Sequence, residues 1–86
     1  MKPTIIIFQK RNKVFDNLAK KSELIFEPFN LAIPAHIFAK QMVRTYGNRI
    51  DGTIATTDES SVISAYFAQY AHLHFFISSK YLHLTK

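Results

Sequence analysis

The chain has 86 residues, of which 48% are hydrophobic, and its 11 Lys and Arg against 6 Asp and Glu give a formal net charge of +5. This length suits one domain, and the apolar content is too high for a disordered or fibrous protein. The absence of cysteine excludes a disulfide framework, a thiol nucleophile and a Cys-ligated zinc site. We therefore expect one folded domain over residues 1–86.

The N-terminal part of the sequence alternates between strand and helix patterns. Residues 4–8 form a continuous apolar run rich in isoleucine, typical of a strand buried on both faces of a parallel sheet. Over residues 12–21, apolar and polar side chains separate onto two faces at helical spacing, which predicts a short helix. Residues 24–26 predict a second strand, which Pro28 stops.

The rest of the chain continues this alternation. A helix is expected between Pro34 and Gly47, because proline fits the first turn of a helix and glycine the left-handed position after the last. Residues 53–56 predict a third strand. Thr57, followed by two acids, is typical of the start of a helix, here one that runs to about residue 71. Alternating apolar side chains from residue 72 predict a strand, then a turn and an edge strand.

This order of elements predicts a small layered α/β domain with about four short, mainly parallel strands and three helices. The alternative is an α+β domain that ends in a C-terminal antiparallel hairpin. Residues 60–79 contain no charged side chain, but eight of the twenty are polar, so we predict no membrane span. No export signal is recognisable, and a cytoplasmic protein is expected.

Positive charge is concentrated in the first half of the chain. Residues 1–49 hold nine basic and three acidic residues, a balance of +6, whereas residues 50–86 have a balance of −1. Such an asymmetry favours a basic surface that faces an anionic partner. Lys10, Arg11 and Lys13 precede a predicted helix, at the positive end of its dipole, and Lys40 and Arg44 repel each other at helical spacing. A bound phosphate would relieve both repulsions. The predicted anion-binding residues are Lys10, Arg11, Lys13, Lys40 and Arg44.

The last predicted helix is apolar around most of its circumference. A helix of this kind is either buried on several sides or covered by another chain. We predict a homodimer whose interface includes Tyr66, Phe67 and Tyr70, and we expect a charged side chain at position 67 or 70 to leave a folded monomer.

Evidence for enzymatic chemistry is sparse. His72 and His74 would share one face of a strand and His83 could join them, but no carboxylate lies close in sequence to orient the rings, so we predict no metal site and no cofactor. Thr56-Thr57-Asp58, with the helix and strand that follow, resembles the strand–Asp–helix–strand tail of PIN-like and NYN-like ribonuclease domains. That resemblance implies a metal-binding role for Asp58. Those families carry a further Asp after the first strand, where this chain has Phe8-Gln9-Lys10.

The leading hypothesis is therefore a small non-enzymatic binding module whose N-terminal basic surface contacts nucleic acid or another polyanion. The alternative is a protein–protein interaction or inhibitor module, of the accessory or mobile-element type, that docks on an acidic partner protein. A third hypothesis is a metal-dependent, nuclease-like enzyme that uses Asp58 or the histidines.

Overall fold

The computed structural model describes residues 2–72 and 74–77, the latter as backbone only. Short 3-10 turns at Lys13–Phe15 and Gly47–Arg49 stand before α1 and after α2. In chain order the other elements are β1 (Thr4–Ile7), α1 (Asp16–Ala19), β2 (Glu23–Phe26), α2 (Ala35–Tyr46), β3 (Gly52–Ala55), α3 (Asp58–Ala71) and β4 (His74–Ile77).

The strands form one parallel sheet in the order β2-β1-β3-β4. At its centre Ile6 of β1 stands opposite Ile25 of β2 on one side and Thr53 of β3 on the other. The prediction of a small α/β domain with a parallel sheet is thus confirmed. The turn and edge strand predicted after residue 77, and with them the antiparallel hairpin of the alternative, lie outside the described residues.

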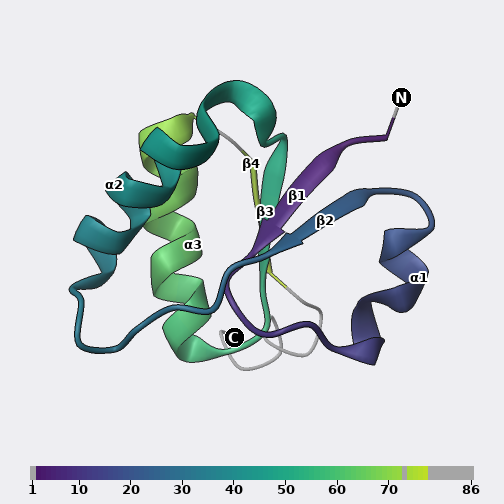
Figure 1. Ribbon diagram of the computed structural model, residues 1–86, viewed down its shortest axis with the longest axis horizontal. Helices are drawn as coiled ribbons and strands as arrows, with labels where there is room; N and C mark the ends of the chain where they lie inside the picture. The colour runs from purple at the N-terminus through teal and green to yellow at the C-terminus, as the bar shows by residue number, and fades with distance from the viewer. Residues whose placement is uncertain (1, 73, 78–86) are drawn as a thin grey trace.

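Helices cover both faces of the sheet. Figure 1 shows α1 on one side and α2 with α3 on the other. This arrangement follows from the strand order: the chain moves from β1 outward to β2, and then back across β1 to β3 and β4, and right-handed crossovers in opposite directions lie on opposite faces.

The apolar run of β1 supplies both cores, because successive side chains of a strand point to opposite faces. Ile5 and Ile7 belong to the core under α1, and Ile6 and Phe8 to the core under α2 and α3. All four are buried, which confirms that this strand is covered on both faces.

The larger core lies under α2 and α3. Phe8 is its centre, with its ring edge-on to Phe38 of α2 at 5.9 Å and to Phe67 of α3 at 5.4 Å between ring centroids. Ile6, Ala39, Ile50 and Ile63 complete the buried part of this core. Aromatic pairs in this geometry stabilise a core beyond the burial of their area, so α2 and α3 are fixed firmly against β1.

The smaller core explains why the first helix is shorter than predicted. Of the predicted segment 12–21, only residues 16–19 are α-helical, after a 3-10 turn. Phe15 is the one fully buried side chain there, tilted against Phe26 at 5.7 Å, with Leu18 half-buried beside it. Two apolar side chains are enough to hold one helical turn against the sheet, but not the roughly three turns that residues 12–21 would form.

Helix ends follow the predicted signals. The Thr57 hydroxyl accepts a hydrogen bond from the backbone of Ser60, whose side chain in turn accepts from the backbone of Thr57, so the predicted cap of α3 is confirmed. Gly47 ends α2 with a φ of 59°. His72 ends α3 with a left-handed backbone and lies outside the strand to which the sequence pattern assigned it. In the described part of the chain, each helix is too short or too polar to cross a bilayer.

Candidate polyanion-binding surfaces

The carboxyl edge of the sheet contains a topological switch point between β1 and β3. From β1 the chain leaves toward α1 on one face, and from β3 it leaves toward α3 on the other. Ligands of open α/β sheets bind in the crevice that such divergent connections create. The residues at this switch point follow β1 and β3 directly: Phe8, Gln9 and Lys10, and Thr56 and Thr57.

One hydrogen bond joins the two sides of the switch point. The Thr56 hydroxyl donates to the side-chain oxygen of Gln9 at 2.5 Å, and both side chains are half-buried. Thr57 is already engaged in the cap of α3. The switch point therefore carries neutral polar groups that are held in place by hydrogen bonds, while Lys10 beside them is exposed.

Three cations follow in quick succession on the connection from β1 to α1. Lys10, Arg11 and Lys13 are all exposed, and we call them the basic loop. The Arg11 guanidinium lies over the Phe26 ring, 5.8 Å from its centroid, and Asn12 fixes the backbone by accepting a hydrogen bond from the amide of Val14 at 3.0 Å. The loop thus presents cations on a shaped backbone, with no acid between residues 9 and 15.

The structure changes the reason for expecting an anion here. A bound phosphate was expected at the positive end of a helix dipole, but α1 has only four residues. A dipole of useful size needs several aligned turns. Attraction at the basic loop therefore comes from the charges of its side chains rather than from helix N–H groups.

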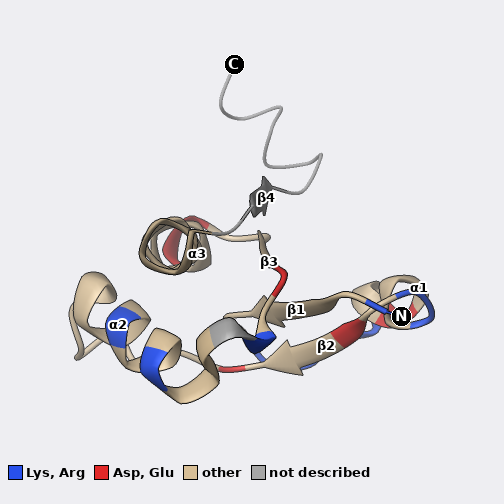
Figure 2. Cartoon of the chain, turned by 90° about the horizontal axis from the view of Figure 1, so that it is seen from above, with Lys and Arg blue, Asp and Glu red and all other residues tan. Residues whose placement is uncertain are grey.

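The five predicted anion-binding residues do not form one surface. Lys40 and Arg44 are exposed on α2, on the face of the sheet opposite α1. Figure 2 shows the basic residues of α2 and those around α1 at opposite ends of the molecule. The five residues therefore lie in two separate groups, because the chain crosses to the other face of the sheet between β2 and β3.

Lys40 stands beside aromatic side chains of α3. Its ammonium lies 5.4 Å from the centroid of the Tyr70 ring, which stacks at 5.9 Å on Tyr66, and Tyr66 in turn meets His36 of α2 edge-on at 6.1 Å. The two tyrosines predicted at an interface are thus at the surface between the helices. Phe67 is not, since it is 0% exposed in the core, so it supplies no surface for a partner.

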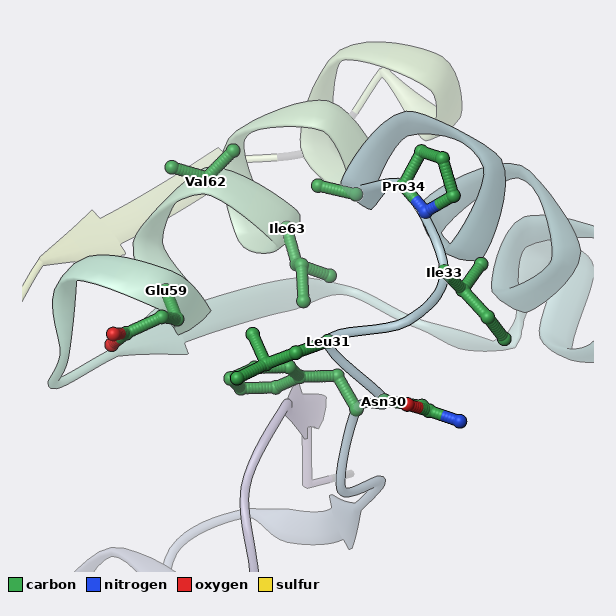
Figure 3. Close-up of a pocket in the computed structure, with 9 residues that line it drawn as sticks. Asn30, Leu31, Ile33, Pro34, Glu59, Val62 and Ile63 are labelled. Carbon is green, nitrogen blue, oxygen red and sulfur yellow. The ribbon is translucent and has the colours of Figure 1, made fainter.

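An apolar pocket adjoins this row of aromatic side chains, at the start of α3. It has a volume of about 270 Å³, and Leu31 and Ile63 point toward one another across it (Figure 3). Leu31 is 78% exposed and Val62, on the rim, 50%. Sequence reasoning missed this pocket because Leu31 lies in a loop, where a single apolar residue carries no periodic signal. The complete lining is Phe29, Asn30, Leu31, Ile33, Pro34, Ala35, Glu59, Val62 and Ile63.

A second hollow, of about 470 Å³, lies at the amino edge of the sheet. Its charges are mixed, because Lys2 and Arg49 line it together with Glu23 and Asp51. The Asp51 carboxylate is already engaged, since it accepts a hydrogen bond from the Thr4 amide at 2.7 Å. This balance of charge makes it a poorer anion site than the basic loop.

The groups proposed for metal chemistry are not assembled in the described residues. Asp58 is exposed at the first position of α3, and across residues 2–72 no three side chains of His, Asp or Glu gather closely enough to hold a metal ion. Of the three histidines considered for a metal site, His72 lies at the end of α3 and outside β4. The side chain of His74 is not described, and His83 lies outside the described residues.

Comparisons of the chain with known protein families, with curated protein sequences and with solved structures found no match.

Proposed function

We propose that this chain is a non-enzymatic binding module whose basic loop contacts the phosphates of nucleic acid or another polyanion. One observation carries the proposal: the exposed cations Lys10, Arg11 and Lys13 follow β1 directly, at the switch point where α/β sheets bind ligands. The neutral donors and acceptors of Gln9 and Thr56 lie beside them.

The chemistry of this surface suits backbone contact rather than the reading of bases. Lysine, arginine and amide side chains are the groups that hold phosphates in most complexes, and such contacts are independent of sequence. Each neutralised phosphate releases counterions, so binding of this kind weakens as salt rises. Salt dependence is therefore the property to measure.

The first experiment is fluorescence anisotropy with labelled single- and double-stranded DNA and RNA at several salt concentrations. We expect binding with a log–log salt slope that corresponds to about three phosphates, one for each cation of the basic loop. The double variant Lys10→Glu/Arg11→Glu should lose this binding, because it replaces two attractive charges with two repulsive ones.

A matched control uses Lys20→Glu/Lys21→Glu. This pair is also exposed and changes the net charge by the same amount, but it lies at the far end of α1. The control should retain most of the binding. Equal losses in the two double variants would mean that only the net charge matters, and an absence of binding at low salt would exclude nucleic acid as the partner.

A second candidate function is docking on an acidic partner protein through the same loop. Val14 favours it, because this apolar side chain is 70% exposed next to Lys13, and phosphates gain nothing from such a neighbour. A Glu-rich peptide that contains leucines should then bind better than poly-glutamate, and Val14→Ser should remove that preference. Under the leading proposal, Val14→Ser leaves oligonucleotide binding unchanged.

A further inference from the structure

The outer face of α2 and α3 carries most of the exposed apolar side chains of the described residues. Five large hydrophobic residues are exposed in the described part of the chain. One of them, Val14, lies in the 3-10 turn before α1. The other four come from α2, from α3 and from the loop that precedes α2: Leu31, Ile37, Val62 and Tyr66. Leu31 and Val62 line the same pocket, and exposed apolar residues that adjoin one another mark an interaction surface.

This face also has a charge gradient along the helices. At the start of α3 stand Asp58 and Glu59, and the Glu59 carboxylate is turned away from the apolar lining of the pocket (Figure 3). Further along lie Lys40 over Tyr70, and Arg44 one turn beyond. Tyr66 and His36 stand between the acidic and the basic end.

Such a face is complementary to itself when one copy is reversed. A two-fold axis that crosses the helices turns the direction of α2 and α3 in the partner copy. The acidic end of each copy then meets the basic end of the other, and the apolar residues meet in the middle. Two-fold pairs in which residue i meets j, and j meets i, are the commonest form of assembly.

We propose that a second copy of this chain occupies the outer face of α2 and α3 in an antiparallel two-fold dimer, with Glu59 of each copy opposite Lys40 of the other. Tyr66 lies near the centre of the interface and the pocket beside Leu31 accepts an apolar side chain of the second copy. This inference is independent of the basic loop, which lies on the opposite face of the sheet and stays accessible.

A nucleic acid is the competing occupant of this face, since Tyr66 and Tyr70 beside Lys40 could stack bases. The observations favour a second copy. Phosphates are repelled by Asp58 and Glu59, and they gain nothing from Leu31, Ile37 or Val62, whereas another copy of the chain uses both the acidic end and the apolar residues.

A charge-swap experiment tests the pairing. In Glu59→Lys, each Lys40 meets a lysine of the partner, and in Lys40→Glu, each Glu59 meets a glutamate, so both variants should dissociate at least about tenfold more readily than the unaltered chain. In an equimolar mixture of the two variants, the heterodimer restores both opposite-charge pairs. Its dissociation constant should return to within about threefold of the unaltered value. Sedimentation equilibrium over a range of concentrations measures all four samples.

Circular dichroism establishes that each variant is folded. Lys20→Glu, directly after α1, serves as the charge-matched control for Lys40→Glu and should leave dimerisation unchanged. The proposal is overturned if the unaltered chain remains monomeric to about 100 µM, the weak end of specific association. It is also overturned if the mixture dissociates as readily as the separate variants, because the proposed pairing brings opposite charges together at both contacts of the heterodimer. Loss of oligonucleotide binding in Lys40→Glu with an unchanged monomer would assign the face to nucleic acid.

Discussion

Thr53 and Ser64 form a buried polar pair between β3 and α3. Both residues are 0% exposed, and the Thr53 hydroxyl donates to the carbonyl of Ile6 at 2.9 Å and lies 3.2 Å from the Ser64 hydroxyl. Buried hydroxyl groups are costly unless they are paired, and the two residues satisfy one another as well as the backbone of β1.

Substitution of this pair should show coupling. Thr53→Val leaves the Ser64 hydroxyl without its partner and should lower the free energy of unfolding by about 1–3 kcal/mol. Ser64→Ala should cost less, and the double variant less than the sum of the single ones, since it removes the group that would be left unpaired. Urea denaturation of the four proteins completes the cycle, and additive effects would show that the two hydroxyl groups act independently.

Tyr46 gives the domain a pH dependence in alkaline solution. Burial, a hydrogen bond to the Glu27 carboxylate and the charge of that carboxylate together raise the pKa of Tyr46 from 10.0 to about 12. Because the folded state holds the proton more tightly than the unfolded state, the stabilisation is complete below pH 10 and is lost as the pH rises toward 12.

The expected result is a free energy of unfolding that falls between pH 10 and about 12, beyond the change seen in Tyr46→Phe. In a spectrophotometric titration of tyrosine ionisation, Tyr46→Phe should lose a component with a midpoint near 12. An unchanged titration curve apart from a uniform reduction in amplitude would mean that Glu27 does not hold this proton.

The apolar residues of α3 point to all sides of the helix, but only those on one side are buried in the core. Phe67 packs on Phe8 in the core, whereas Tyr66, the preceding residue, is 36% exposed. The expectation that a charge at position 67 would leave a folded monomer does not fit a residue that no water reaches.

Substitution of Phe67 should therefore affect mainly the stability of the fold, and substitution of Tyr66 mainly the proposed dimer. Phe67→Ala removes a ring from the centre of the larger core and should cost about 3–5 kcal/mol in the free energy of unfolding. Tyr66→Ala should cost less than about 1 kcal/mol in the monomer, measured by thermal or urea denaturation at high dilution, while it weakens the proposed dimer. Comparable losses of stability would contradict the distinction between a core face and an outer face.

Local signals predicted the helix ends well, and long-range signals were weaker. The cap at Thr57 and the glycine after α2 could be recognised from a few neighbouring residues, since these patterns solve a local hydrogen-bonding or backbone problem. The length of α1 could not, because it depends on how much of the sheet Phe15 and Leu18 can reach.

At the scale of the whole molecule, alternation of apolar runs and helical patterns predicted the α/β class and the two buried faces of β1. It did not predict which cations share a surface. That depends on the strand order, which sends Lys10 and Lys40 to opposite faces although both belong to the basic half of the sequence. Basic residues that are close in the sequence can therefore lie on different faces of the folded domain.

The central place of β1 also has a consequence for how the chain acquires its structure. Ile6 pairs with Ile25, 19 residues later, and its carbonyl receives the Thr53 hydroxyl, 47 residues later. Until β3 is available, the edge of β1 that it pairs with is open, and an apolar strand with an open edge is prone to pair with other chains. Folding of this domain is therefore expected to compete with association: β1 can pair with β3 of the same chain or with a strand of another molecule. Dilution favours pairing within the chain.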